Sequence, residues 1–220
     1  MIRFDRVSKR YETGHEALKR VSFHLDPGEM AFLTGHSGAG KSTLLKLIMM
    51  MERPTQGEVW VDGQNLSQLP RRQIAYHRRK IGVVFQDHQL LFDRSVFDNV
   101  AMPLVVSGFP HREVGRRVRA ALDKVGLLAK ENHNPMTLSG GQQQRVGIAR
   151  AVVHKPSILL ADEPTGNLDP DLSREVMHLF DEFNQVGVTV LLASHNLALI
   201  ASLRHRMITL RDGEAISGAS

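Results

Sequence analysis

Residues 35–42 read Gly35-His36-Ser37-Gly38-Ala39-Gly40-Lys41-Ser42, the pattern G-x-x-x-x-G-K-S of a phosphate-binding loop, or P-loop. An apolar run from Met30 to Leu33 precedes the loop, and Thr43-Leu44-Leu45-Lys46-Leu47-Ile48 follows it. This order predicts a buried strand, a glycine loop and a helix. Glycines let the backbone wrap closely around an anion, and the first N–H groups of the helix point toward that anion. The stretch therefore predicts an α/β fold with a triphosphate site.

The residues of this loop have separate predicted roles. We expect nucleotide contacts from Gly35, His36, Ser37, Gly38, Ala39, Gly40, Lys41, Ser42 and Thr43. The Lys41 ammonium is expected to reach the β- and γ-phosphates, and the Ser42 hydroxyl to bind the Mg²⁺ that bridges them. The predicted cofactors are therefore ATP and Mg²⁺.

Two adjacent carboxylates form a second candidate group. Asp162 and Glu163 end the apolar run Ile158-Leu159-Leu160-Ala161, so both can reach a site at the end of a buried strand. One carboxylate can bind magnesium, and the other can accept a proton from an attacking water. We assign the metal to Asp162 and the water to Glu163.

A second anion site is predicted at residues 138–142, which read Leu138-Ser139-Gly140-Gly141-Gln142. Ser139 is a suitable N-cap for a helix expected over residues 143–153, and the helix dipole points its positive end at the loop. The two anion sites lie on different parts of the fold. Head-to-tail packing of two chains would therefore place each nucleotide between one P-loop and the other chain's Ser139 loop.

Composition restricts the class of protein. The chain has 220 residues, 42% of them hydrophobic and 23% charged, which is ordinary for a globular domain. It contains no cysteine, so disulfides and thiolate chemistry are excluded, and its histidines lack metal-ligand spacing. It has no signal-peptide pattern and no run of about eighteen apolar residues, so we expect no membrane span.

Basic residues are concentrated in two clusters. The formal net charge is +5, which suits an anionic partner such as nucleic acid or the inner leaflet of a membrane. The first cluster contains Arg71, Arg72, Arg78, Arg79 and Lys80, and the second contains Arg112, Arg116, Arg117 and Arg119. Solvated helix faces are the alternative interpretation of both clusters.

Hydrophobic periodicity predicts the remaining strands. Alternation of apolar and polar residues indicates half-buried antiparallel strands over residues 2–7, 21–25 and 57–62. Near-continuous apolar runs over residues 81–85, 157–161 and 188–193 are typical of strands that helices cover on both faces. A terminal hairpin is expected over residues 207–216, with its turn at Arg211-Asp212-Gly213.

Helices are predicted mainly in the middle of the chain. The P-loop helix is expected to end near residues 52–54, and another helix is expected over about 172–185. Between residues 87 and about 134 the pattern becomes helical. One helix there carries an apolar stripe opposite its arginines, formed by Val114, Val118, Ala121, Leu122, Val125 and Leu128.

The chain resembles the nucleotide-binding domains of ABC ATPases over essentially its whole length. The resemblance is carried, in chain order, by the P-loop, Gln86, Leu138 to Gln142, Asp162-Glu163, Asn167-Leu168-Asp169 and His195. It implies a P-loop core with a mixed sheet, an N-terminal antiparallel β subdomain and an inserted α-helical subdomain. We therefore expect a single domain, with the core and β subdomain in residues 1–86 and 155–220. The helical subdomain, with the signature motif, is expected at about 87–154.

The resemblance also implies roles for individual residues. Tyr11 is expected to stack on adenine, and Gln86 to touch magnesium and sense a membrane partner. Asp169 is expected to join the two active sites of a dimer, and His195 to contact the γ-phosphate. Ser139 to Gln142 correspond to the family signature, which binds the nucleotide of the second chain.

Some segments resemble the ATPases of bacterial cell division in particular. They are residues 27–37, Phe85-Gln86-Asp87-His88, residues 123–128 and residues 161–169. Thr165-Gly166-Asn167-Leu168-Asp169 is shared with lipoprotein-release and macrolide-export ATPases, so an exporter subunit is the alternative. A nucleic-acid-associated ABC ATPase is a weaker alternative, because the chain lacks the inserted coiled coils, zinc modules or tandem domain of such proteins. Met49-Met50-Met51 departs from the relatives, and we expect altered packing there without altered chemistry.

The resemblance to division ATPases implies a set of partners. We expect a homodimer in the ATP-bound state and an integral membrane subunit of the FtsX type, through which dimer closure regulates cell-wall hydrolysis. Contact with the cytoplasmic division machinery and a peripheral location on the cytoplasmic face of the inner membrane are also implied. No nucleic acid is expected as a partner.

Overall fold

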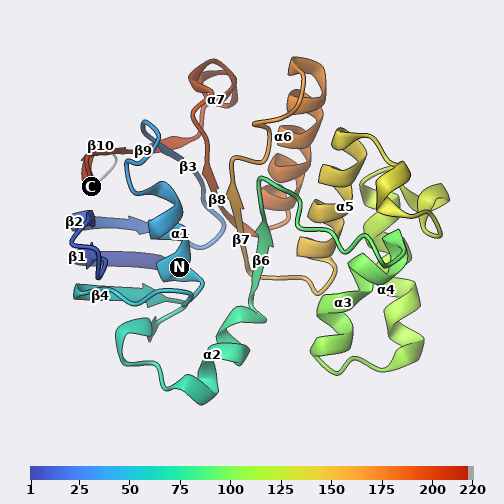
Figure 1. The fold of residues 1–220 in the computed structure, drawn as a ribbon, viewed down its shortest axis with the longest axis horizontal. Helices are drawn as coiled ribbons and strands as arrows, with labels where there is room; N and C mark the ends of the chain where they lie inside the picture. The colour runs from blue at the N-terminus through green and yellow to red at the C-terminus, as the bar shows by residue number, and fades with distance from the viewer. Residues whose placement is uncertain (218–220) are drawn as a thin grey trace. The chain divides into compact units, whose positions relative to one another are not determined.

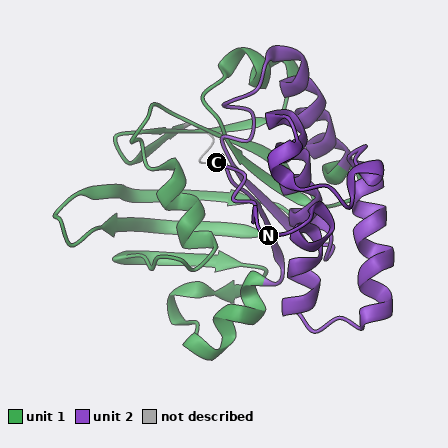
Figure 2. Ribbon diagram, turned by 45° about the vertical axis from the view of Figure 1, so that its right-hand side comes forward, with its two compact units in different colours: residues 1–78, 183–220 green, residues 79–182 purple. Residues whose placement is uncertain are grey.

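The computed structural model describes residues 1–217, which form two compact units, coloured differently in Figure 2. Unit 1 combines residues 1–78 with the chain from residue 183 onward. Unit 2 is the continuous segment 79–182. The chain therefore leaves unit 1 after Arg78 and returns to it at Phe183.

Unit 1 contains an antiparallel sheet built from N-terminal strands. Its strands lie in the order β2-β1-β4-β5 (Figure 1), with bounds Ile2–Arg10 for β1, Glu16–Leu25 for β2, Gln56–Val61 for β4 and Gln64–Asn65 for β5. Phe4 and Phe23 are direct partners across β1 and β2, and their rings stack with centroids 4.7 Å apart. Val59 and Val61 are buried, whereas Trp60 faces the other way and is half-buried. The predicted alternation is confirmed, and β1 and β2 are longer than predicted.

A second group of strands in unit 1 leads into the P-loop. β3 (Met30–Thr34) pairs in parallel with both β8 (Thr189–Ala193) and β9 (Arg206–Arg211). Every residue of β3 and of β8 is buried, as expected for strands without a solvent-facing side. β10 (Glu214–Ser217) completes the predicted hairpin with β9, and Asp212 and Gly213 supply the positive φ angles of its turn, 48° and 84°.

Helices α1 (Lys41–Ile48), α2 (Arg71–Arg78) and α7 (Leu197–Leu203) and the 3₁₀ turn η1 (Leu66–Gln68) also belong to unit 1. Helix α2 was not predicted from the sequence, because His77 is its only buried residue and no apolar stripe marks it. α7 was not predicted either.

The P-loop helix α1 is shorter than predicted, ending at Ile48 rather than near residues 52–54. Met50 adopts a left-handed φ of 55°, which stops the helix. Side chains of α2 bind the carbonyl oxygens at this end: His77 Nε2 lies 2.7 Å from that of Ile48, and Arg78 donates to those of Met49 and Met50 at 3.0 and 2.9 Å. The helix end is therefore set by tertiary contacts, which the local sequence does not encode.

Unit 2 combines two parallel strands with several helices. β6 (Ile81–Val84) pairs with β7 (Ile158–Asp162), and Val84 lies opposite Ala161. The helical elements are α3 (Val96–Val106), α4 (His111–Lys124), η2 (Leu128–Lys130), η3 (Pro135–Thr137), α5 (Gly140–Val152) and most of α6 (Pro170–Gln185). α3, α4 and α5 pack against one another.

The helix boundaries in unit 2 correct three predictions. Leu128 was placed on the apolar stripe of α4, but α4 ends at Lys124 and Leu128 is 39% exposed in η2. α5 begins at Gly140 rather than residue 143, directly after Ser139, which is its N-cap as predicted. α6 begins at Pro170 rather than about 172, because the Asp169 carboxylate accepts hydrogen bonds from the backbone at its start.

The fold class is confirmed: an α/β protein with an antiparallel N-terminal sheet, parallel strands and a helical insertion. In the part of the chain that the structure describes, every helix is too short or too polar to cross a membrane.

Candidate active site

The P-loop leaves β3 and enters α1, in the order that the sequence predicts. Gly35 and Gly40 have φ angles of 144° and 106°. A Cβ atom on Gly40 would lie 2.5 Å from the carbonyl oxygen of Ala17, and one on Gly35 would collide with that of Leu210. Glycine is therefore required at these positions, because neighbouring strands press directly against the loop backbone.

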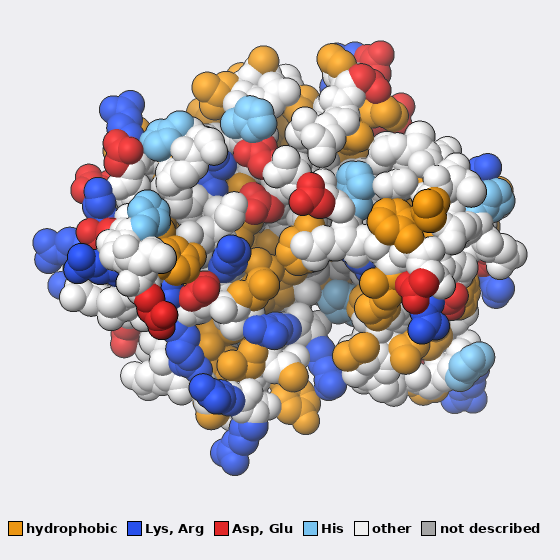
Figure 3. Space-filling view, viewed as in Figure 1, with side chains coloured by type: hydrophobic (Ala, Val, Ile, Leu, Met, Phe, Trp, Pro, Cys, Tyr) orange, Lys and Arg blue, Asp and Glu red, His pale blue; other side chains and the backbone are white. Residues whose placement is uncertain are grey.

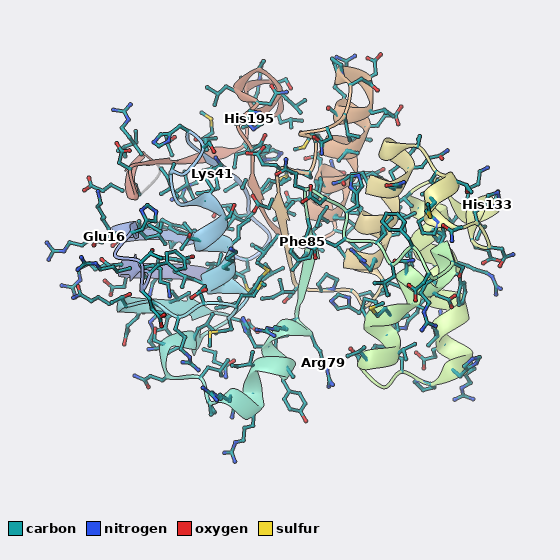
Figure 4. The ribbon with its side chains drawn as sticks, viewed as in Figure 1. Glu16, Lys41, Arg79, Phe85, His133 and His195 are labelled. Atoms are coloured by element: carbon teal, nitrogen blue, oxygen red, sulfur yellow. The ribbon has the colours of Figure 1, made fainter. Side chains whose placement is uncertain are left out.

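Lys41 folds back over the P-loop from the first turn of α1. Its Nζ donates hydrogen bonds to the carbonyl oxygens of Gly35 and His36 at 2.8 and 3.2 Å. The residue is only 8% exposed, and Figure 4 labels it at the start of the helix. A buried ammonium is stable only with such partners. The same group can donate to a phosphate oxygen, while Ser42 is exposed at the same helix end.

Tyr11 lies beside the P-loop helix. Its hydroxyl is 3.2 Å from Oγ1 of Thr43, and the Nζ of Lys9 lies 5.0 Å from the centroid of its ring. The ring is half-buried. The structure thus brings together two residues, Tyr11 and Thr43, that were assigned to nucleotide contacts on separate grounds.

His195 follows β8 at the edge of the sheet where the P-loop follows β3. The two strands run parallel with Leu33 opposite Ala193, and the Ser194 N–H donates to the carbonyl oxygen of Leu33 at 3.1 Å. Gly35 and His195 therefore leave neighbouring strands at their carboxyl ends. His195 is exposed, and Figure 4 labels it with Lys41 in unit 1.

In unit 2, Gln86 and Glu163 follow paired strands at equivalent positions, each two residues beyond the opposed pair Val84 and Ala161. A Cβ atom on Gly166 would lie 3.6 Å from the Gln86 Nε2 and 3.7 Å from the Glu163 Cβ, so both residues border this glycine. Glu163 has a φ of 48°. Left-handed backbone in a non-glycine residue is strained, and such strain is concentrated at functional sites.

The predicted metal ligands supply oxygen donors. Asp162 is half-buried at the end of β7, Gln86 follows β6, and Ser42 lies in the first turn of α1. Magnesium prefers oxygen ligands and keeps several waters and phosphate oxygens, so one or two protein groups suffice. Within residues 1–217, no cluster of three or more His, Asp or Glu side chains could hold a metal ion. Oxygen donors of this kind suit magnesium that phosphate oxygens also bind.

The signature loop lies at the start of α5. The Ser139 Oγ accepts from the Gln142 N–H at 3.4 Å, and the Gln142 Oε1 accepts from the Ser139 N–H at 3.1 Å, which is a capping box. A Cβ on Gly141 would lie 2.8 Å from Leu172, so this glycine permits packing against α6. Gly140 has open space around it and is exposed, so the backbone of the loop is accessible to a ligand.

The structure also reveals contacts of the P-loop that sequence reasoning missed. His36 Nε2 lies 3.3 Å from Oδ1 of Asp212, in the turn of the β9–β10 hairpin. Just before the loop, the hydroxyls of Thr34 and Thr209 lie 2.9 Å apart. The C-terminal hairpin therefore braces the P-loop, and no local pattern links residues so distant in sequence.

Known proteins are similar in sequence to this chain over nearly its whole length. Residues 18–166 match a family model described as "ABC transporter". The chain is 60% identical over 218 residues to the cell division ATP-binding protein FtsE of Escherichia coli strain K12, covering 99% of this chain and 98% of the relative. It is 45% identical over 213 residues to FtsE of Bacillus subtilis strain 168, covering 97% of this chain and 93% of the relative.

Solved structures share the fold. A dimeric structure of the bacterial ABC transporter cassette MJ0796 superposes with a TM-score of 0.90 at 38% identity, covering 99% of this chain and 97% of that chain. A dimeric post-hydrolysis structure of MJ0796, bound to ADP and phosphate, has a TM-score of 0.90 at 37% identity with the same coverage.

Proposed function

The chain belongs to the ABC transporter family of ATPases, and we propose that it is the ATP-hydrolysing subunit of a membrane complex in bacterial cell division. The observation that carries this proposal is the 60% identity to FtsE over 98% of that protein. As an ABC-type ATPase, the chain binds nucleotide and converts ATP and water to ADP and phosphate.

The P-loop is proposed to bind the triphosphate of ATP. Entry of the phosphates would draw the Lys41 ammonium from the carbonyl oxygens that it now contacts to the more negative phosphate oxygens. Tyr11 would stack on adenine, since its hydroxyl contact with Thr43 places the ring at the P-loop helix. His195 would contact the γ-phosphate from the end of the neighbouring strand.

Hydrolysis is proposed to depend on Glu163. Its carboxylate would accept a proton from the water that attacks the γ-phosphorus, while ADP departs with the bond electrons. Ser42, Asp162 and Gln86 would hold Mg²⁺, which supplies charge neutralisation at the β- and γ-phosphates. The left-handed backbone of Glu163 supports this assignment, because it marks the residue as held in an unfavourable conformation.

Two copies of the chain are proposed to share each ATP. The N-terminus of α5 presents exposed Ser139 and Gly140 and suits an anion. We propose that this loop binds the γ-phosphate held by the P-loop of the second copy, and that Asp169 links the two sites. The dimeric MJ0796 cassette, 38% identical to this chain, supports this arrangement.

We propose an integral membrane partner of the FtsX type and a location on the cytoplasmic face of the inner membrane. The α-helical subdomain, predicted at about residues 87–154, would contact this partner. In support, the neighbouring residues Val105 and Val106 at the end of α3 expose 64 and 69% of their surface, and adjacent exposed apolar side chains are typical of an interaction site. Dimer closure would act through the partner on cell-wall hydrolysis, together with the cytoplasmic division machinery.

Charge on α2 supports a position near the membrane. Residues 71–80 contain five Lys and Arg residues and no acidic residue. The formal charge of this segment is therefore +5, the same as the formal net charge of the whole chain. Blue side chains gather over α2 in Figure 3. Arg71 and Arg72 lie in the first turn, where the helix dipole disfavours positive charge. An anionic surface or an acidic segment of the partner would relieve this repulsion.

The Glu163→Gln variant tests the catalytic assignment. It should retain ATP binding, lower kcat by about 100-fold or more, and accumulate an ATP-bound dimer, because general-base catalysis contributes about 10²- to 10⁴-fold. Glu214→Gln, the same change at an exposed position of β10, is the matched control. Unchanged turnover in Glu163→Gln would show that another group activates the water.

Two further experiments test the dimer and the partner. Ser139→Arg should bind ATP as a monomer but fail to dimerise in sedimentation with ATP, since the added side chain fills the shared site. Copurification of the native complex should yield an FtsX-type membrane subunit. Recovery of a subunit with the long periplasmic architecture of an exporter would instead support an export function.

A further inference from the structure

The segment after Gln86 contains a strained bend. His88 and Gln89 have φ angles of 55° and 47°, so two consecutive non-glycine residues adopt left-handed backbone. Each such residue is unfavourable for an L-amino acid, and the conformation persists only where surrounding contacts impose it. The bend begins two residues after Gln86, the residue assigned to magnesium and to the membrane partner, so contacts that hold the bend also limit the positions open to Gln86.

Arg150 of α5 holds this bend. Its Nη2 donates to the carbonyl oxygen of His88 at 2.6 Å, and its Nη1 donates to that of Gln89 at 2.7 Å. The guanidinium fork thus binds two successive carbonyl groups, which point the same way because of the left-handed backbone. Burial lowers the pKa of Arg150 from its ordinary value, which indicates that the charge is desolvated where it binds the bend.

The residues of α5 that contact the bend lie on one face of the helix. Gln144, Gly147 and Arg150 are spaced three residues apart and therefore share one side of the helix. His88 Nδ1 contacts Oε1 of Gln144, and a Cβ on Gly147 would come within 3.9 Å of the His88 carbonyl oxygen. Gly147, which has no side chain, lets the backbone at His88 come close to α5, and Gln144 and Arg150 on either side of it bind His88.

The segment is fixed from the other side by α3. Asn99 is completely buried, accepts a hydrogen bond from the Leu91 N–H at 2.8 Å and donates to the Leu91 carbonyl oxygen at 2.9 Å. Residues 88–91 are therefore bound by two helices. Gln86 and Asp87 are exposed. They lie between the end of β6 at Val84 and the bend at His88, so this short stretch is held at both ends.

We propose that Arg150 is a positioning residue, which locks the bend beyond Gln86 to α5 and so couples Gln86 to the Ser139 loop at the start of that helix. Arg150 lies ten positions after Gly140 on this helix, a rise of about 15 Å. This proposal rests on the proposed function, in which Gln86 and Ser139 serve two different ATP sites. A signal from the membrane partner at one site would thus reach the other through a rigid helix.

Because the chain contains no cysteine, a single introduced cysteine can be labelled to test whether Arg150 holds the bend. A nitroxide attached to Gln89→Cys, an exposed position, reports the mobility of the bend by electron paramagnetic resonance. Arg150→Met should increase this mobility clearly. Arg145→Met is the matched control, because it removes another arginine of α5, one paired with Glu175, and should leave the mobility unchanged.

ATPase kinetics test the coupling. Arg150→Met should bind ATP within about twofold of the unmodified chain, yet lose about 10- to 100-fold in kcat, because misplacement by about 1 Å is costly to catalysis. The kcat of Arg150→Lys should fall between that of the unmodified chain and that of Arg150→Met, since an ammonium cannot bind both carbonyl groups with the geometry of the guanidinium fork. If Arg150→Met does not fold, the lysine variant decides both measurements.

The outcomes separate this proposal from the proposed function. Unchanged nitroxide mobility in Arg150→Met and Arg150→Lys would overturn the lock, and increased mobility with normal kcat would overturn the coupling. An equal kcat loss in Arg145→Met would also overturn it, because loss of any α5 arginine would then suffice. Failure of the unmodified chain and its native complex to hydrolyse ATP would refute the proposed function, whereas the mobility measurement would still decide whether Arg150 holds the bend.

Discussion

Replacement of Gly40 by alanine tests whether the P-loop is shaped by its contacts with neighbouring strands. Gly40 has a φ of 106°, and an added Cβ would lie 2.5 Å from the carbonyl oxygen of Ala17 and 2.8 Å from Cδ2 of Leu18. Gly38, in the same loop, has a φ of 80° but open space around a Cβ. The pair of variants Gly40→Ala and Gly38→Ala therefore separates backbone strain from steric collision.

The two costs can be estimated from this geometry. Gly38→Ala carries only the left-handed backbone penalty, about 1 to 2 kcal/mol. Gly40→Ala carries a similar penalty and in addition overpacks the loop against β2, which costs about 1 to 3 kcal/mol. The expected difference in the free energy of unfolding is thus about 2 kcal/mol. For a chain of this length, about 2 kcal/mol corresponds to about 4 to 8 °C in Tm.

Thermal unfolding without nucleotide, followed by circular dichroism, measures this difference. Gly63→Ala, with a φ of 72° and open space in a turn outside the P-loop, is a second reference for strain alone. Equal Tm values for Gly40→Ala and Gly38→Ala would refute the reasoning, because contact with Ala17 and Leu18 would then impose no requirement for glycine.

Three other perturbations probe separate parts of the chain. Lys41→Ala should weaken ATP binding by about 100-fold or more in equilibrium titration, because charge-assisted hydrogen bonds contribute about 1.5 to 3 kcal/mol each; retention of full affinity would contradict its assignment. Burial lowers the pKa of His154 below its ordinary 6.5, so the unfolded chain takes up this proton first. Stability should therefore fall as pH drops below about 6.5, and His154→Gln should reduce that loss in urea midpoints measured from pH 7.5 to 5.5. Asn99→Ala should lower the free energy of unfolding by about 2 to 4 kcal/mol in urea titration, since it leaves both backbone groups of Leu91 without their buried partner. A loss below about 0.5 kcal/mol, the usual range for a surface change, would contradict this role.

Much of the fold was predictable because its signals are local. The P-loop, the buried strands β3, β7 and β8, and the terminal hairpin were predicted from runs of a few residues, and all are confirmed. The capping role of Ser139 was likewise predictable, since a cap and its helix are adjacent in sequence. Predictions failed where a boundary depended on distant side chains, as at the end of α1, where residues of α2 bind the carbonyl groups.

The sequence by itself determined which chemical groups this protein carries and the order in which they occur. Lys41, Glu163 and the Ser139 loop are predicted site residues because phosphate binding and proton transfer require particular residues next to particular strands and helices. Only the tertiary structure decided how these groups are supported. The bond from Arg150 to the bend at His88 and the contact of His36 with Asp212 join residues 62 and 176 positions apart. Such contacts leave no pattern along the chain, because they depend on how separate elements pack in space.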